Sequence, residues 1–332
     1  MSNPKILGIP PLRSGGLMLS YRCNQSCGHC AYRCGPDAGG WMEESVLEIT
    51  LEGLSAERRL IDIHLAGGEP TLNPGLLTKA ILLATRHGIR ISYMETNGAF
   101  DSSPKKARET LRPLRDAGLP AILLSVSPYH NEFTPLSRTL NCLEAGLDIF
   151  GEEGVFPWLD HFFPMLARMD PETTHSLDEF MAVNGITNGR ELLQLFPLTP
   201  GGRVPEKLGD LFVKGSPDQY RHFNCREILF GVSHFHIDPE GNLFTGHCPG
   251  IVSATAPELH PPKTAENSPI FWTLAKGGPY ALMEAAGEVC GFEPNAEGYV
   301  SPCDLCFQIR LALLEHSPKK WPELAPATFY RG

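Results

Sequence analysis

The chain has 332 residues, 42% of them hydrophobic, and a formal net charge of −10 at pH 7. This length suits one large α/β domain with an appended module, and the negative charge disfavours binding to nucleic-acid phosphates, which needs a basic surface. The start of the chain holds no apolar run of signal-peptide length, and no stretch approaches the roughly 20 apolar residues that span a bilayer. We therefore expect a cytoplasmic protein without a nucleic-acid or membrane partner, whose ten cysteines are metal ligands rather than disulfides.

The first two thirds of the chain alternate short β-rich runs with helical stretches, which indicates a parallel sheet built from βα units. Asn73 and Pro74 open one helix that stops at Gly88, and Ser103 with Pro104 opens the next. After an N-terminal extension of residues 1–16, residues 17–200 are therefore expected to form a partial (β/α)6 TIM-like barrel. Its strands are expected at 17–21, 62–66, 89–95, 121–127, 155–159 and 192–196, with further helices at 42–59 and from Thr134 and Pro135 to Gly146.

The composition changes after about Gly201, where prolines and glycines become frequent and the βα alternation stops. Five of the ten cysteines lie between Cys225 and Cys306. Residues 235–244 predict a hairpin with its turn at Asp238 to Gly241, because Pro and Gly supply the turn geometry. We expect residues 201–332 to form a small C-terminal module that depends on a metal centre.

A cysteine motif of the form C-x3-C-x2-C follows the first expected strand, at Cys23, Cys27 and Cys30. Three thiolates leave one iron of a four-iron cluster without a protein ligand, so a cofactor can bind there. Cys34 extends the motif by a fourth thiol. A closed four-cysteine cluster or a structural zinc site therefore stays open as an alternative.

The three cysteines, followed by Gly67-Gly68-Glu69-Pro70 after the second expected strand, resemble the two signature motifs of the radical SAM superfamily. The resemblance implies a 4Fe-4S cluster that binds S-adenosylmethionine at its open iron and cleaves it reductively to a 5′-deoxyadenosyl radical. It also implies that GGEP holds the methionine amino group through backbone oxygens and Glu69. His29 departs from the pattern, since the family usually has an aromatic residue there.

Two further segments resemble the cofactor pocket of that superfamily. Residues 96–98 match a T-N-G segment through Asn97, and residues 125–127 fall where the family often has S-x-D. Ser127 replaces the aspartate, which makes Ser125 the better candidate for a contact to the ribose. Turn chemistry alone also explains both segments.

The C-terminal cysteines resemble the auxiliary-cluster modules called SPASM and twitch domains. No cysteine follows the final C-x-x-C pair, so one auxiliary 4Fe-4S cluster fits better than two. A structural zinc on the same thiols is the alternative. Cys142, inside a helix, is expected to be a small buried hydrophobe. The expected cluster ligands are Cys225, Cys248, Cys303 and Cys306, with Cys290 as the substitute.

Ligands of parallel βα arrays lie at the carboxyl ends of the strands, so polar residues there are the candidates for substrate contact. Arg203 and His130 are the expected catalytic residues. Arg203 follows two glycines that allow close backbone approach, and its position resembles an Arg-Gly segment in other radical SAM proteins. His234 and His236 alternate along one strand and are interpreted as a surface ladder. Ordinary structural hydrogen bonds are the default interpretation of His64, Glu95, Tyr129 and His161.

Twitch and SPASM relatives mostly modify peptides, so the resemblance implies hydrogen abstraction from a ribosomally made peptide. It also implies a low-potential electron donor such as flavodoxin or ferredoxin. The roughly 16 residues before the first strand hold no peptide-recognition domain, which keeps oxidation or rearrangement of a small metabolite as an alternative. A non-catalytic iron-sulfur or zinc protein is the third hypothesis.

Overall fold

One eight-stranded sheet runs through the chain in the order β5-β4-β3-β2-β1-β6-β7-β8. The computed structural model describes residues 6–99 and 102–331, so residues 1–5 of the expected N-terminal extension lie outside the described residues. Strands β1 to β5 are parallel neighbours, β6 is parallel to β1, and β7 and β8 are antiparallel. The α/β class is confirmed. The strands are β1 (Ser14–Met18), β2 (Asp62–Ala66), β3 (Ile91–Thr96), β4 (Ile122–Ser125), β5 (Val155–Trp158), β6 (Phe235–Ile237), β7 (Asn242–Phe244) and β8 (Ala254–Thr255).

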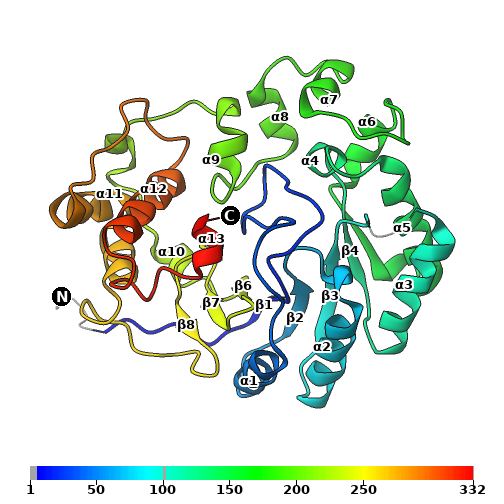
Figure 1. Cartoon of the computed structure of the whole chain (residues 1–332), viewed down its shortest axis with the longest axis horizontal. Coiled ribbons are helices and arrows are strands. Elements are labelled where there is room, and N and C mark those ends of the chain that lie inside the picture. Colours follow the sequence, from blue (N-terminus) through cyan, green and yellow to red (C-terminus); the bar gives the residue numbers. More distant parts are fainter. Residues whose placement is uncertain (1–5, 100–101, 332) are drawn as a thin grey trace.

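Four long helices lie along the outer side of the curved row of strands (Figure 1). They are α1 (Glu44–Ser55), α2 (Pro74–Arg86), α3 (Pro104–Asp116) and α5 (Leu136–Phe150). The predicted N-terminal caps are confirmed: the Asn73 side chain accepts a hydrogen bond from Leu76 N, and that of Ser103 accepts one from Lys106 N. These helices cover the outward-facing apolar residues of the strands, such as Ile63 and Leu65, which are fully buried.

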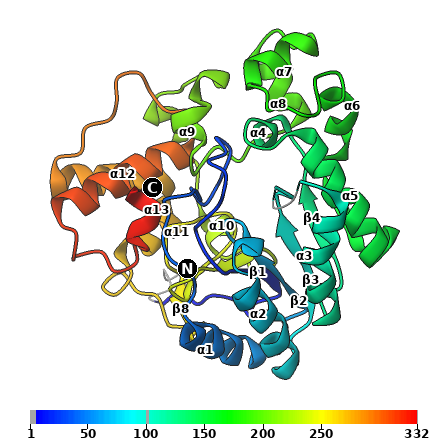
Figure 2. The same ribbon diagram turned by 45° about the vertical axis from the view of Figure 1, so that its right-hand side comes forward.

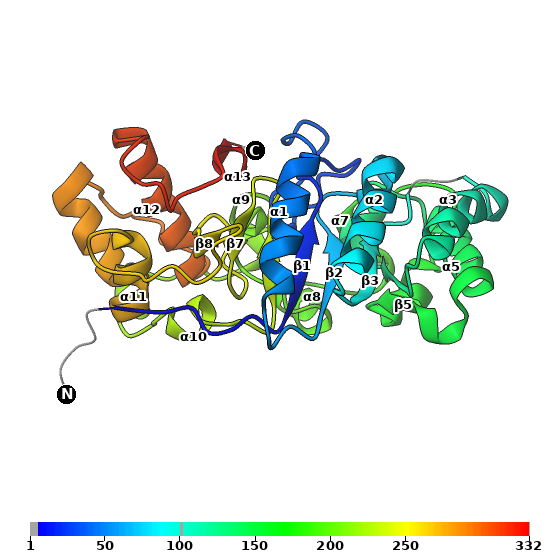
Figure 3. The ribbon, with the colours of Figure 1, turned by 90° about the horizontal axis from the view of Figure 1, so that it is seen from below.

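The remaining helices are shorter or belong to the C-terminal region. Viewed from below, α11 and α12 lie at one end of the molecule and β5 with α5 at the other (Figure 3). The remaining helices are α4 (Pro128–Asn131), α6 (Phe163–Leu166), α7 (Leu177–Val183), α8 (Gly189–Leu195), α9 (Val204–Lys207), α10 (Arg226–Leu229), α11 (Pro269–Cys290), α12 (Pro302–His316) and α13 (Ala327–Arg331).

The expected sixth strand at 192–196 is wrong, because this run lies mostly in helix α8. Asn188 caps the helix by accepting a hydrogen bond from Glu191 N at 3.2 Å. A short apolar run fits either a strand or a helix, and the Asn cap favours the helix. The sixth parallel strand is instead β6, which pairs with β1 on the other side from β2.

The expected end of the fourth long helix at Gly146 is also wrong. Gly146 lies inside α5, where an added Cβ would approach Ile122 at 3.0 Å and Val155 at 3.1 Å. The helix runs to Phe150 and ends at Gly151, whose φ is 76°. Gly146 therefore allows the close contact between α5 and the sheet, and Gly151 ends the helix.

The predicted hairpin at 235–244 is confirmed and joins the C-terminal region to the central sheet. Its turn is fixed by Asp238, whose Oδ1 accepts from Glu240 N and Asn242 N, both at 2.9 Å. The other carboxylate oxygen accepts a hydrogen bond from Tyr21 Oη at 3.1 Å. Because Tyr21 precedes the first cysteine motif, this contact ties the hairpin to the loop after β1. Figure 2 shows that loop, in dark blue, between α9, α12 and α13 on one side and β4 with α4 on the other.

Candidate iron-sulfur and cofactor site

The loop between β1 and α1 brings three predicted ligands, Cys23, Cys27 and Cys30, into one tight turn. Cys23 N donates to Gly35 O at 3.0 Å, and Cys30 N donates to Cys27 O at 3.1 Å. Cys23 and Cys27 are buried and Cys30 is half-buried. Burial raises the pKa of Cys23 to about 12 and that of Cys27 well above its usual range. Buried thiols of this kind become thiolates when a metal centre supplies positive charge, so this donor set fits an iron cluster.

Cys34 lies beside Cys30. Its backbone N donates to Cys30 Sγ at 3.3 Å, and a hydrogen bond between the two side chains lowers the pKa of the Cys30 thiol. Cys34 is itself buried, with 6% of its surface exposed. The fourth thiol therefore lies beside Cys30, and a closed four-cysteine site stays the alternative.

The GGEP turn after β2 packs directly on the backbone of the cysteine loop. Glu69 N donates to Arg22 O at 3.0 Å. A Cβ on Gly68 would lie 1.7 Å from the same oxygen, and Gly67 has a φ of 94°. Only glycine allows this approach, so the glycine pair brings the end of β2 against the start of the cysteine motif.

The Glu69 carboxylate is fully buried and fastens this turn to the end of β3. Oε1 accepts from Thr71 N, Thr71 Oγ1 and Thr96 Oγ1, and Oε2 accepts from Asn97 N at 2.8 Å. Burial raises the pKa of Glu69, and these hydrogen bonds oppose that shift. Four donors from the protein use both oxygens, so the Glu69 carboxylate holds the turn in place.

Asn97, an expected cofactor-binding residue, and Ser125, the expected contact to the ribose, differ in their surroundings. Asn97 Nδ2 donates to Asn24 Oδ1 at 2.8 Å, and its Oδ1 accepts from Ala99 N at 2.9 Å, so the side chain braces the cysteine loop. Ser125 is half-buried at the end of β4. Ser127, which stands where the family often has aspartate, is bonded to His130 Nδ1 at 2.7 Å.

Arg203 does not follow a strand, because the run before it is helical, and its guanidinium binds the cysteine loop. Nη1 donates to Cys27 O at 2.9 Å and Nη2 to Cys34 O at 2.8 Å, while its backbone N donates to Cys30 O. Only 6% of the residue is exposed. The donors of Arg203 hold the loop that carries the three thiols.

His130 lies on α4, with its ring 4.7 Å from that of His29 in an edge-on arrangement. Burial lowers the pKa of His130 to about 4. Tyr129 is fully buried beside it and packs against His29 and Phe196. His161 is exposed on the surface. Of the polar candidates after β4 and β5, only the α4 residues lie near the cysteine loop.

Sequence reasoning missed a cluster of histidines on β2, β6 and the segment after β7. The surface-ladder interpretation is wrong for His236, which is 4% exposed, and His64 is 2% exposed. Their rings lie 5.2 Å apart across Gly16 of β1, and a Cβ on Gly16 would lie within 2.6 Å of both. His234 and His247 complete the group. The signal available in the sequence was Gly16, a residue without a side chain on the strand between them.

The histidine cluster is neutral and has unused hydrogen-bonding atoms. Burial lowers the pKa of His64 to about 3 and raises that of Glu95, whose Oε1 lies 3.5 Å from His64 Nε2, to about 7. Neither His64 Nε2 nor His236 Nδ1 has a hydrogen-bond partner among the described residues. Tyr32 of the cysteine loop packs its ring 4.9 Å from His236, and its hydroxyl is also unpartnered there. The cluster therefore adjoins the first cysteine site and can accept a polar ligand.

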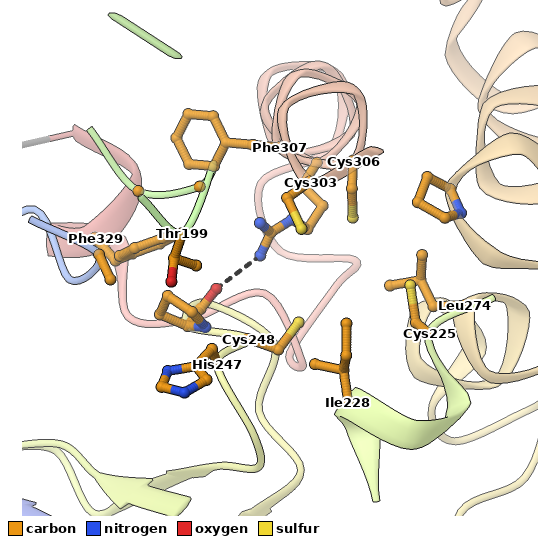
Figure 4. Close-up of a pocket in the computed structure, with 16 residues that line it drawn as sticks. Thr199, Cys225, Ile228, His247, Cys248, Leu274, Cys303, Cys306, Phe307 and Phe329 are labelled. Carbon is orange, nitrogen blue, oxygen red and sulfur yellow. Dashed lines mark hydrogen bonds between the residues drawn. The ribbon is translucent and has the colours of Figure 1, made fainter. Parts of the chain in front are cut away.

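The four predicted auxiliary ligands line one pocket at the N-terminal end of α12 (Figure 4). Their sulfur atoms point into the space between α12 and the α10 segment. Burial raises the pKa of Cys248 to about 12 and that of Cys303 to about 11. Ala31, which follows Cys30, and Gly202 line the same pocket, so the first cysteine loop borders the second cysteine group. The four ligands are Cys225, Cys248, Cys303 and Cys306.

Cys290, the substitute ligand, ends α11 and does not line this pocket. Its Sγ donates to Ala286 O at 3.2 Å. Cys142 is buried inside α5, as expected of a small hydrophobe. Among the described residues, no three His, Cys, Asp or Glu side chains stand close enough together to ligate a single metal ion. A helix able to cross a membrane is also absent from the described part of the chain.

Comparison with known proteins finds a family that the part of the chain with the first site resembles. Residues 17–159 match the model of the radical SAM superfamily. The chain is 25% identical over 161 residues to the putative peptide biosynthesis protein YydG of Bacillus subtilis, covering 48% of each chain. It is 31% identical over 157 residues to the GTP 3',8-cyclase of Acidothermus cellulolyticus, covering 44% of this chain and 42% of the cyclase. The matches thus span about half the length of these relatives or less.

Two solved structures that match this chain have low sequence identity and TM-scores below 0.5. The structure of anSMEcpe with bound AdoMet and the Cp18Cys peptide has a TM-score of 0.46 and 13% identity, covering 93% of this chain and 97% of that one. BtrN in complex with AdoMet and 2-DOIA has a TM-score of 0.36 and 14% identity, with coverages of 73% and 77%. The radical SAM superfamily, whose model matches residues 17–159 and thus less than half of this chain, uses a 4Fe-4S cluster and S-adenosylmethionine.

Proposed function

We propose that this chain is a radical SAM oxidoreductase that removes a hydrogen atom from a carbon of a ribosomally made peptide. The observation that carries the proposal is the contact between the two signature motifs. Glu69 N donates to Arg22 O, next to Cys23, and Gly68 has no room for a Cβ against that oxygen. The two motifs therefore lie against each other, so that residues of both would hold a cofactor bound to a cluster on the cysteine loop.

In this proposal Cys23, Cys27 and Cys30 hold the first cluster, and the backbone oxygens of the GGEP turn receive the methionine amino group. When bound and reduced by one electron from a donor such as flavodoxin or ferredoxin, S-adenosylmethionine supplies a 5′-deoxyadenosyl radical that takes hydrogen from carbon. Glu69 positions the turn, and Arg203 positions the cysteine loop through two of its carbonyls. Ser125, with its half-buried side chain, is the proposed ribose contact.

The proposed place for the substrate is the inner side of the sheet, beside the histidine cluster. His64 Nε2, His236 Nδ1 and Tyr32 Oη are buried without partners among the described residues, and each can donate or accept a hydrogen bond. Unpaired buried polar groups are costly, so a polar substrate group that satisfies them gains affinity. His130, beside the cysteine loop, is the other proposed contact to the reacting centre.

We further propose that residues 201–332 hold one auxiliary 4Fe-4S cluster on the four cysteines of the pocket, while residues 17–200 hold the first. The support is the convergence of four buried or half-buried thiols from three separate segments. A double variant, Cys303→Ala with Cys306→Ala, is expected to lose about four irons per chain. Zinc in place of iron at full cysteine occupancy would contradict this part of the proposal.

The peptide substrate is favoured by the similarity to YydG, which is named a putative peptide biosynthesis protein. A small-metabolite substrate is the second candidate, because the GTP cyclase is the more identical of the two relatives over a similar length. A short open reading frame beside the gene separates the two. The encoded peptide, made synthetically, is expected to change mass when incubated with the reconstituted enzyme.

The test of the chemistry is anaerobic reconstitution, addition of dithionite and S-adenosylmethionine, and chromatographic assay for 5′-deoxyadenosine. Product is expected from the wild type and from Cys34→Ala, and not from Cys27→Ala. If the wild type makes no product and Cys34→Ala loses the first cluster, the site is a closed four-cysteine centre. The enzyme proposal is then overturned.

A further inference from the structure

Arg310 lies at the second cysteine site and is one of the residues that line its pocket. It is four residues after Cys306 and seven after Cys303 on α12, so the three side chains share one face of that helix. Only 6% of Arg310 is exposed. A guanidinium stays charged even when buried, so this position carries a positive charge inside the protein.

The fixed contacts of Arg310 are neutral. Nη1 donates to Pro249 O at 3.0 Å, the dashed line in Figure 4, and to Tyr330 Oη at 3.0 Å. The rings of Phe307 and Tyr330 lie 5.6 and 5.5 Å from the guanidinium carbon. No Asp or Glu of the described residues forms an ion pair with it, and Nε has no hydrogen-bond partner there. The charge of Arg310 is therefore uncompensated by a carboxylate.

The four thiols are the groups on which this charge acts. Arg310 and the four thiols line the same pocket, and Cys303, Cys306 and Arg310 lie on one face of α12. A buried cation without a carboxylate partner is costly, and anionic sulfur is the partner that the surroundings offer.

We propose that Arg310 is a positioning residue that compensates the charge of the auxiliary cluster and raises its reduction potential. The proposal rests on the proposed function, since it requires a cluster on the four cysteines. Four thiolates around an oxidised 4Fe-4S core give a net charge of −2, and uptake of one electron makes it −3. A fixed positive charge at the sulfurs stabilises the more negative form, so the cluster becomes easier to reduce.

The experiment uses the full chain with Cys23, Cys27 and Cys30 replaced by Ala, so that only the auxiliary cluster forms. Iron and sulfide are counted, and the midpoint potential is measured by an EPR-monitored redox titration. Arg310→Gln is expected to favour the oxidised form at least tenfold, a potential about 59 mV lower for one electron. Arg310→Lys keeps the charge and is expected to lie between Arg310→Gln and the parent.

Two control variants make the outcome specific. Arg221→Gln removes an exposed arginine whose charge is paired with Asp218 at 2.8 Å, and it is expected to leave the potential unchanged. Tyr330→Phe removes one hydrogen bond to Arg310 but not its charge, and a smaller shift than that of Arg310→Gln is expected.

The outcomes separate the two proposals. A cluster of four irons with an unchanged potential in Arg310→Gln overturns the role of Arg310 and leaves the auxiliary cluster intact. Loss of iron in Arg310→Gln with retention of iron in Arg310→Lys supports charge compensation. Loss of iron in both variants overturns it, because the shape of the arginine side chain then matters and its charge does not. Absence of iron in the parent variant overturns the auxiliary cluster and Arg310's role together, and 5′-deoxyadenosine formation by the wild type still tests the first site.

Discussion

Single buried side chains with several hydrogen bonds determine the shape of the first cysteine site. Glu69 accepts four hydrogen bonds that join the GGEP turn to the end of β3. Arg203 donates two that join the cysteine loop to the segment before α9. From the sequence alone, either residue could be taken for a group that contacts cofactor or substrate, since acids and arginines are frequent in active sites. Their partners show that both hold the backbone in place.

Arg203→Met is expected to leave the carbonyls of Cys27 and Cys34 buried without their donors. Two charge-assisted hydrogen bonds are lost, which costs about 3 kcal/mol of stability. The measurement is urea unfolding of the apo protein, together with the iron content after anaerobic reconstitution. Full iron retention with unchanged stability would show that Arg203 is free to contact substrate instead.

At the scale of elements, the strand ends and their loops meet because glycine removes the side chain at the points of contact. Gly68 lets the turn after β2 touch the loop after β1, and Gly202 lets the segment before α9 touch Cys30 O, 2.5 Å from where its Cβ would stand. Gly16 does the same on β1 for the two buried imidazoles of His64 and His236. The two cysteine groups and the histidine cluster are therefore assembled from elements distant in the sequence.

Gly68→Ala is expected to abolish S-adenosylmethionine binding and to destabilise the fold, because its Cβ would overlap Arg22 O. The matched control is Gly75→Ala at the start of α2, where the nearest atom to a new Cβ is Asn73 Oδ1 at 3.7 Å. Alanine favours a helix over glycine by about 1 kcal/mol, so the control is expected to be neutral or stabilising. Calorimetric titration with S-adenosylmethionine and thermal unfolding compare the two. Equal binding by Gly68→Ala and the wild type would refute the proposed contact.

At the scale of the whole molecule, the sheet joins both cysteine sites into one structure. Strands β6 to β8 come from the C-terminal region and extend the sheet that β1 to β5 begin. Tyr21 and Asp238 tie the same two regions at the hairpin. We therefore expect unfolding of the C-terminal region to release the cysteine loop as well.

The buried histidines give the apo protein a stability that depends on pH. His64 has a folded pKa of about 3 and an ordinary value near 6.5, so below pH 6.5 the unfolded chain binds more protons than the folded one. The contribution of neutral His64 to the free energy of unfolding is complete at pH 7, and it is about 2 kcal/mol smaller at pH 5. The raised pKa of Glu95 has the opposite effect, because its contribution to stability falls as the pH rises toward 7. The effects of His64 and Glu95 on the pH dependence must therefore be measured separately.

His64→Gln isolates the histidine, because Glu95 is present in both proteins. The variant is expected to gain about 2 kcal/mol relative to the wild type between pH 7 and pH 5, measured by urea unfolding of apo protein at each pH. If the difference in free energy of unfolding between the two proteins does not change with pH, His64 is protonated in the folded state.

The sequence by itself determined the features that depend on neighbouring residues. The spacing of Cys23, Cys27 and Cys30 and the GGEP turn indicated the superfamily, and the caps at Asn73 and Ser103 marked two helices correctly. Caps and turns can be predicted from the sequence because they are formed by hydrogen bonds between residues a few positions apart, whatever the fold of the rest of the chain. The short apolar run at 192–196 was ambiguous, because its neighbouring residues do not distinguish a strand from a helix.

Only the tertiary structure decided what the other polar residues do. Arg203 reaches a carbonyl 176 residues earlier in the chain, and His64 meets His236 across Gly16. Arg310 lies among four thiols that come from three segments. These surroundings arise from packing between distant elements, which composition and spacing do not encode. The cysteines could thus be read from the chain, whereas the charges and hydrogen bonds that hold them became visible only in the fold.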